Sequence, residues 1–173
     1  AYQQVGDQKT MAGKDKFFAI ERRGGYPWAD GFFNRNDTAP LPKQLDGNVA
    51  KFTLHISDAP PASDVKASLT LRCVLFQADE ADDFEIRFNG TRLSVTTRDP
   101  EWKDAQIFSP KPQPTSGYKP RPIDPKQRLL RLDCAVPVKA WKPGSNEVEI
   151  RVSSGKSTVQ IEKVEAHVKY ELA

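Results

Sequence analysis

Two segments of the chain combine aromatic side chains with hydrogen-bonding ones. A flat aromatic ring stacks on the apolar face of a sugar, while Arg, Asn and Asp side chains hydrogen-bond to its hydroxyl groups. One segment is the predicted loop at 23–49 with Arg22 just before it, and the other covers 98–127. The candidate ligand-binding residues are Arg22, Arg23, Tyr26, Trp28, Asp30, Asn34 and Arg35 in the first segment, and Trp102, Tyr118 and Arg121 in the second.

The aromatic residues of these segments have two competing roles. We expect Phe32 and Phe33 to fill the core, because Phe is mostly buried in folded proteins. For Trp28, Trp102 and Tyr118, a ligand platform and a core position remain equal alternatives. A binding domain would expose some of these rings, whereas a structural domain would bury them.

The net charge of +3 comes from one part of the chain. Between Arg98 and Arg128 there are seven Lys or Arg residues and four Asp or Glu residues, and the rest of the chain is balanced. The planar guanidinium group matches carboxylate and sulfate geometry, which favours an acidic or sulfated polysaccharide over a neutral one. A solvated loop is the alternative explanation. The charge is too small to predict nucleic-acid binding, and no apolar run is long enough to span a bilayer.

The chain lacks the residue patterns typical of catalysis. There is no HExxH, GxSxG, phosphate-binding loop or CxxC pattern. His55 and His167 lie in phase with the polar residues of their strands, so we expect both to be solvated on the outer faces. The acidic residues cluster beside turns, where carboxylates are usually solvated or bonded to the backbone. We therefore expect a protein that is not an enzyme.

The two cysteines lie in phase with leucines of two predicted strands. Cys73 follows Leu69 and Leu71, and Cys134 follows Leu130 and Leu132. This pattern predicts two buried free thiols, with a disulfide between two sheets as the alternative.

A predicted hairpin at 82–97 is the strongest local signal. Apolar residues alternate before Asn89-Gly90, a pair that suits a tight turn with positive φ. A two-residue turn would pair the flanking strands so that one face is buried. The residues predicted to share that buried face are Phe84, Ile86, Phe88, Leu93 and Val95.

Further strands are predicted at 16–22, 51–57, 68–76, 129–136, 147–152 and 159–172. Val74 and Phe76 predict that one strand is covered on both faces at its end. The apolar phase changes near Glu162-Lys163, which predicts a β-bulge. Trp141 precedes a turn and is predicted to close the core. We predict an all-β, antiparallel β-sandwich over 15–173, with a loose tail or linker at 1–14 and a Pro-rich loop at 98–127.

The strand ending in "FNG" and the later turn "KPGSN" followed by "EVEIRV" carry a family resemblance. Together they resemble the galactose-binding-domain-like β-sandwich, a jelly roll found in carbohydrate-binding modules and accessory domains of glycoside hydrolases. The resemblance covers roughly 15–172. The stretch "FFAIERRGGYPWADGFFNRNDTAPLP" also looks like the start of domains attached to bacterial glycoside hydrolases.

This resemblance implies a non-catalytic, secreted or periplasmic module. It would bind a polysaccharide or oligosaccharide and target a catalytic domain in the same parent chain. A structural accessory sandwich without a ligand is the alternative. Sandwiches of this type often hold a structural calcium ion; the oxygen-bearing side chains in the first segment suit calcium but lack EF-hand spacing, and we assign no ligands.

Overall fold

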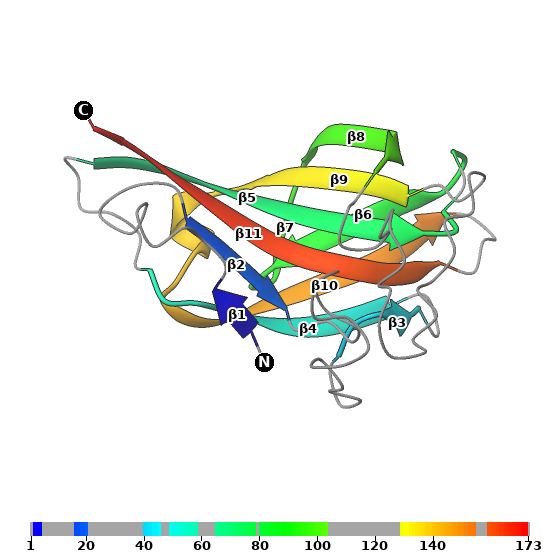
Figure 1. The fold of residues 1–173 in the computed structure, drawn as a ribbon, viewed down its shortest axis with the longest axis horizontal. Coiled ribbons are helices and arrows are strands. Elements are labelled where there is room, and N and C mark those ends of the chain that lie inside the picture. The colour runs from blue at the N-terminus through cyan, green and yellow to red at the C-terminus, as the bar shows by residue number, and fades with distance from the viewer. Residues whose placement is uncertain are drawn as a thin grey trace, which may run out of the picture.

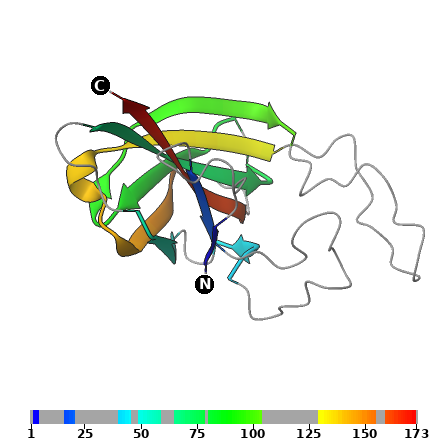
Figure 2. The same cartoon turned by 60° about the vertical axis from the view of Figure 1, so that its left-hand side comes forward.

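The structure is a computed structural model that describes residues 2–4, 16–20, 40–45, 49–58, 65–78, 80–103, 129–154 and 159–172. Within these ranges it is almost entirely β-strand, with no α-helix and one three-residue 3-10 turn at Val138–Ala140. The strands form two packed antiparallel sheets (Figures 1 and 2), which confirms the predicted β-sandwich.

The larger sheet has the order β1-β2-β11-β5-β9-β8, and β3 pairs with β11 beside this path. The smaller sheet has the order β4-β10-β6-β7. The strands of the larger sheet are β1 (Tyr2–Gln4), β2 (Lys16–Ile20), β3 (Lys43–Gln44), β5 (Val65–Phe76), β8 (Val95–Trp102), β9 (Leu129–Val136) and β11 (Gln160–Leu172). Those of the smaller sheet are β4 (Val49–Ile56), β6 (Asp83–Phe88), β7 (Thr91–Arg92) and β10 (Gly144–Ser154).

The alternation of apolar and polar residues along each strand determines which side chains form the core. One face of each sheet is apolar, and these two faces pack together to form a single cluster of buried side chains. The register of β11 against β5 shifts between Ile161 and Lys163, so the predicted bulge is confirmed. Trp141 is buried and its indole N–H donates to the backbone oxygen of Asp58 at 2.9 Å, which confirms its predicted position at the edge of the core.

The predicted hairpin forms, but it is shorter than expected. Asn89 and Gly90 have φ values of 49° and 82°, and Phe88 pairs with Thr91. Ile86, Phe88 and Leu93 are buried and Phe84 is half-buried, as the alternation predicts.

The prediction that Val95 is buried opposite Phe84 is wrong. The Leu93 N–H still bonds to the Ile86 oxygen at 2.8 Å, but the chain then leaves the smaller sheet. Val95 begins β8 in the other sheet, where it pairs with Cys134 and is 40% exposed.

Two predicted segment boundaries differ from the structure. Tyr2–Gln4 form β1 and pair with β2, although the sequence pattern predicts a loose tail at 1–14. Arg98–Trp102 belong to β8, although the sequence predicts that the Pro-rich loop begins at 98. Pro100 is tolerated there because β8 is an edge strand whose register shifts between Asp99 and Trp102.

Two asparagines join the hairpin turn to the start of β10 and the residues that precede it. The Nδ2 group of Asn89 donates to the oxygen of Ala140 at 2.7 Å and to Oδ1 of Asn146 at 2.8 Å. Oδ1 of Asn89 accepts from the N–H of Glu147 at 2.8 Å. We call Asn89 and Asn146 the asparagine lock.

Asn146 is fully buried at the centre of this lock. Its Nδ2 group donates to the oxygens of Lys142 and Gly144 at 2.9 and 3.0 Å, and its Oδ1 also accepts from the Lys142 N–H at 3.2 Å. The lock therefore ties the hairpin turn to the backbone between Ala140 and Glu147.

Replacing Asn146 tests the lock. Asn146→Ala removes the acceptor of Asn89 and leaves the carbonyls of Lys142 and Gly144 without this donor, so we expect a loss of about 2–4 kcal/mol in the free energy of unfolding. Urea unfolding measures the loss. Ser145→Ala, beside Asn146 in β10 but exposed, is the matched control. Equal unfolding midpoints for the two variants would contradict a stabilising role for the lock.

The two cysteines are buried and free, as predicted. They lie on neighbouring strands of the same sheet, where Cys73 pairs with Leu132 and Cys134 pairs with Leu71. This diagonal arrangement excludes the alternative of a disulfide between two sheets. Burial is the main cause that raises the pKa of Cys73 well above its ordinary value, and it raises the pKa of Cys134 to about 12.

Thiol titration checks this arrangement. In the native protein at neutral pH, neither thiol should react with a disulfide reagent, because both are buried and protonated. In denaturant without reductant, two thiols should react. A denatured protein that shows no reactive thiol would contradict the free state of Cys73 and Cys134.

Candidate functional site

Of the ten candidate ligand-binding residues, Trp102 lies within the described part of the chain. The others, Arg22, Arg23, Tyr26, Trp28, Asp30, Asn34, Arg35, Tyr118 and Arg121, lie outside the described residues. The oxygen-bearing residues considered for calcium lie outside them as well. The described ranges contain no group of three or more His, Cys, Asp or Glu residues that could hold a metal ion. The site is therefore built around Trp102 and its neighbours.

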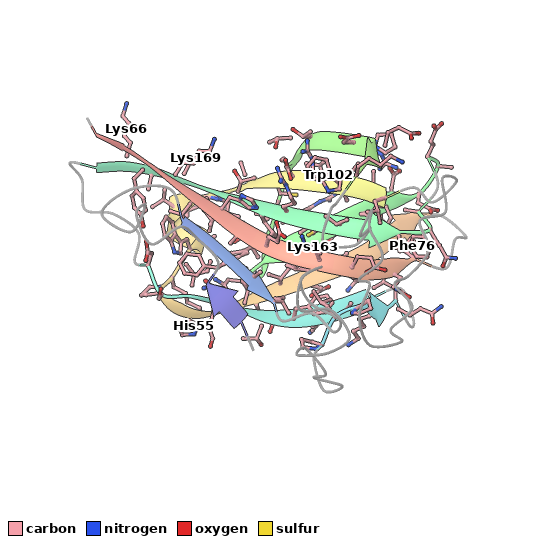
Figure 3. The ribbon with its side chains drawn as sticks, viewed as in Figure 1. His55, Lys66, Phe76, Trp102, Lys163 and Lys169 are labelled. Atoms are coloured by element: carbon pink, nitrogen blue, oxygen red, sulfur yellow. The ribbon has the colours of Figure 1, made fainter. Side chains whose placement is uncertain are left out.

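Trp102 ends β8 and packs on the outer face of the larger sheet (Figure 3). It joins Phe76 in contact with the fully buried side chains of Val74 and Leu129, away from the main core. This satellite cluster confirms that the end of β5 is covered on both faces. It forms because β5 and β9 carry apolar residues on their outer face at this end.

Two arginines flank the Trp102 ring. The guanidinium carbon of Arg131 lies 4.4 Å from the ring centroid, and that of Arg72 lies 5.2 Å from it. Both distances are within the range of a cation–π interaction. We call Trp102, Arg72, Arg131 and Asp133 the Trp102–arginine cluster.

Asp133 is the carboxylate partner in this cluster. Nε and Nη2 of Arg72 donate to its two oxygens at 2.9 and 3.2 Å, which is a bidentate pair. Nε of Arg131 lies 3.6 Å from Oδ2 of Asp133, which is too long for a hydrogen bond. That Nε is buried and has no hydrogen-bond partner among the described residues. Two guanidinium groups thus lie against one carboxylate.

Sequence reasoning missed Arg72, Arg131 and Asp133. Alternation places all three on the polar faces of their strands, but it does not show which strands are neighbours. The observed register places Arg72 opposite Asp133 on one side and opposite Glu165 on the other. The row Asp133–Arg72–Glu165 therefore crosses three adjacent strands.

A second set of polar side chains extends from this row along β11. Glu165 bonds to Nζ of Lys163 at 3.0 Å and to Nε2 of His167 at 3.1 Å. Nearby, Oε1 of Glu162 accepts from Nε2 of Gln160 at 2.8 Å. Lys163 and Glu165 are 9% and 5% exposed although they lie on the outer face of the sheet, and Glu162, at the bulge, is 0% exposed.

The expectation that both histidines are solvated is wrong for His167. It lies on the outer face, as predicted, but it is half-buried and bonded to Glu165. His55 is also half-buried on the outer face of β4. Sequence alternation alone cannot detect this, because the cover over an outer face depends on contacts distant in the chain.

Lys163 and His167, the two side chains that bond to Glu165, determine its ionisation. Burial by itself raises the pKa of a carboxyl group. The hydrogen bond from His167 and the charge of Lys163 outweigh burial, so the pKa of Glu165 lies below its ordinary value of 4.5. Glu165 is therefore a stable carboxylate at neutral pH and a poor proton donor.

The outer face of the smaller sheet differs from this arrangement. Arg87 bonds to Glu85 at 2.5 Å, and Arg151 bonds to Glu149 at 3.0 Å. Both arginines are about half exposed, with side-chain exposures of 45% and 50%. Exposed pairs of this kind contribute little to stability, and they supply controls for the larger sheet.

No family model matches the chain, and no curated protein matches it. The part of the chain that the structure describes contains no helix long and apolar enough to cross a membrane.

The pH dependence of stability tests the Glu165 group. Because the folded pKa is lowered, Glu165 stabilises the fold above its ordinary pKa, and this contribution is lost as the pH falls through the folded pKa. Glu165→Gln should lower the free energy of unfolding by on the order of 3 kcal/mol at neutral pH. The difference from the unmodified protein should shrink in acid, as measured by urea unfolding across pH.

Glu85→Gln is the matched control on the smaller sheet. Its effect should be small and should vanish in high salt, because Glu85 pairs with an exposed arginine. The effect of Glu165→Gln should persist in salt. A Glu165→Gln effect that does not change between neutral and acidic pH would contradict the assigned role of its charge.

Proposed function

We propose that the chain is a non-catalytic carbohydrate-binding module with a galactose-binding-like jelly-roll fold. It binds a polysaccharide or oligosaccharide and targets a glycoside hydrolase domain in the same parent chain. The observation that carries this proposal is the Trp102–arginine cluster on the outer face of the larger sheet.

The cluster combines the two kinds of group that sugar recognition needs. The indole of Trp102 supplies a rigid apolar surface, and it is only partly buried. Arg72, Arg131 and Asp133 supply hydrogen-bond donors and acceptors beside that ring. All four residues lie on ordered strands, so the geometry is available without rearranging the sandwich.

The electrostatics support binding rather than glycoside hydrolysis. That reaction uses a pair of carboxyl groups, one of which has a raised pKa so that it can donate a proton. Glu165 has a lowered pKa, and Asp133 is held by a bidentate arginine. The lowered pKa of Glu165 makes this carboxyl group unsuited to donate a proton at neutral pH.

The preferred ligand in this proposal is an acidic or sulfated polysaccharide. Two guanidinium groups lie against one carboxylate, and the side chains of Arg72 and Arg131 are partly exposed. A sulfate or uronate oxygen supplies the acceptor chemistry that an arginine fork matches. A secreted or periplasmic location accords with such a ligand, and a structural calcium ion remains part of the proposal without assigned ligands.

One observation favours the alternative of a structural accessory domain. Trp102 packs against Val74, Leu129 and Phe76, so its ring also anchors the edge strand β8 to the sheet. In this alternative, the arginines fix the ring and no external ligand is bound. Binding experiments separate the two functions.

Affinity electrophoresis in gels that contain neutral or anionic polysaccharides is the test. We expect the protein to be retarded by an anionic polysaccharide, with less retardation at high salt because exposed charges are screened. Arg131→Gln should weaken binding roughly tenfold, the effect of one hydrogen bond to a charged group. Arg87→Gln, on the opposite sheet, should bind as the unmodified protein does.

Further variants test the aromatic residues. Trp102→Phe keeps an aromatic ring in the satellite cluster and should weaken binding at both low and high salt. Trp28→Ala and Arg121→Ala test the candidate residues outside the described ranges. Absence of retardation by every polysaccharide would favour the structural accessory domain. Retardation by neutral polysaccharides alone would contradict the preference for an acidic or sulfated ligand.

A further inference from the structure

Asn89 is followed by Gly90, a pair prone to spontaneous deamidation. In this reaction the backbone nitrogen of Gly90 attacks Cγ of Asn89, a C–N bond forms, and the bond from Cγ to Nδ2 breaks with release of ammonia. Water then opens the cyclic imide to give aspartate or isoaspartate. Glycine favours the reaction because it has no side chain to hinder the attack.

The turn leaves open space around Gly90, the residue that supplies the attacking backbone nitrogen. Gly90 is exposed, and a Cβ built on it would meet no atom within 4 Å. Open space therefore lies beside Cα of Gly90, and the restraint on the reaction lies in the Asn89 side chain.

That side chain is held by the asparagine lock. Both protons of Nδ2 are used, one in the 2.7 Å bond to Ala140 and the other in the 2.8 Å bond to Asn146. Oδ1 accepts from the Glu147 N–H at 2.8 Å. Cγ cannot turn toward the Gly90 nitrogen unless these three bonds break together.

We propose that Asn89 is a latent deamidation site that the folded asparagine lock keeps unreactive, and that its modification prevents the lock from re-forming. Aspartate would place a carboxylate oxygen where Nδ2 now donates to two oxygens. Asn146 cannot compensate by rotating its amide, because its own Nδ2 group is bonded to Lys142 and Gly144. Isoaspartate would add a backbone carbon to a two-residue turn whose register is set by Phe88 and Thr91.

The consequence is that irreversible deamidation accumulates at one end of the sandwich. Local opening permits deamidation, and deamidation removes the bonds that close the turn. The site therefore records how often this end of the sandwich opens. This inference concerns the lock alone and does not depend on the proposed carbohydrate binding.

Peptide mapping by mass spectrometry tests the proposal on the intact chain. The protein is incubated at mildly alkaline pH in native buffer and in urea, and conversion is followed at Asn89. We expect Asn89 to react roughly tenfold or more slowly in native buffer, because the rate follows the population of the locally opened state. Asn146, which precedes Glu147, is the internal control and should react slowly even in urea.

Asn146→Ala gives the second arm. It leaves the Asn89-Gly90 pair unchanged but removes one partner of Nδ2, so native deamidation should accelerate while the rate in urea stays the same. Circular dichroism verifies that the variant is folded, and Ser145→Ala is the matched control. Asn89→Asp should unfold at lower urea than the unmodified protein.

Three results would overturn the proposal. Equal rates for Asn89 in native buffer and in urea would show that the lock gives no protection. No conversion at Asn89 in urea would show that the pair is not reactive. An Asn89→Asp variant as stable as the unmodified protein would show that modification does not open the turn.

Discussion

The fold depends on the hydrogen-bonded contact between Asn89 and Asn146. Asn89 lies in the hairpin turn and Asn146 lies near the start of β10, far along the sequence, and each also bonds to backbone groups between Ala140 and Glu147. The contact lies at the start of β10, the strand that pairs with both β4 and β6 within the smaller sheet. It also gives a physical reason for the two short motifs, "FNG" and "KPGSN", to occur in one chain.

The larger sheet meets a different constraint, because its outer face carries charges that are largely removed from water. Removing charges from water is costly unless they are paired, and here the register supplies the pairs. Arg72 lies between Asp133 and Glu165, and Glu165 also contacts Lys163 and His167. At the end of this row, the paired arginines and Trp102 form the surface on which the proposed function rests.

Local sequence rules predicted most of the strands because they depend on short-range chemistry. The alternation around Asn89-Gly90 predicted the turn and the burial of Ile86 and Phe88. The phase change in the last strand predicted its bulge. The rules were wrong for Val95 because they cannot show where a strand leaves one sheet for the other. The same limit hid β1 and the strand character of 98–102, whose pairing partners are distant in sequence.

The sequence by itself determined the all-β class, the turn residues, the buried cysteines and the presence of Trp102 beside a basic segment. These features follow from side-chain period and from the conformations that Asn, Gly and Pro allow. Only the tertiary structure decided that Trp102 meets Arg72 and Arg131, and that His167 is bonded rather than solvated. The physical reason is strand order: alternation assigns a side chain to a face, whereas its neighbours on that face come from strands chosen by the packing of the whole chain.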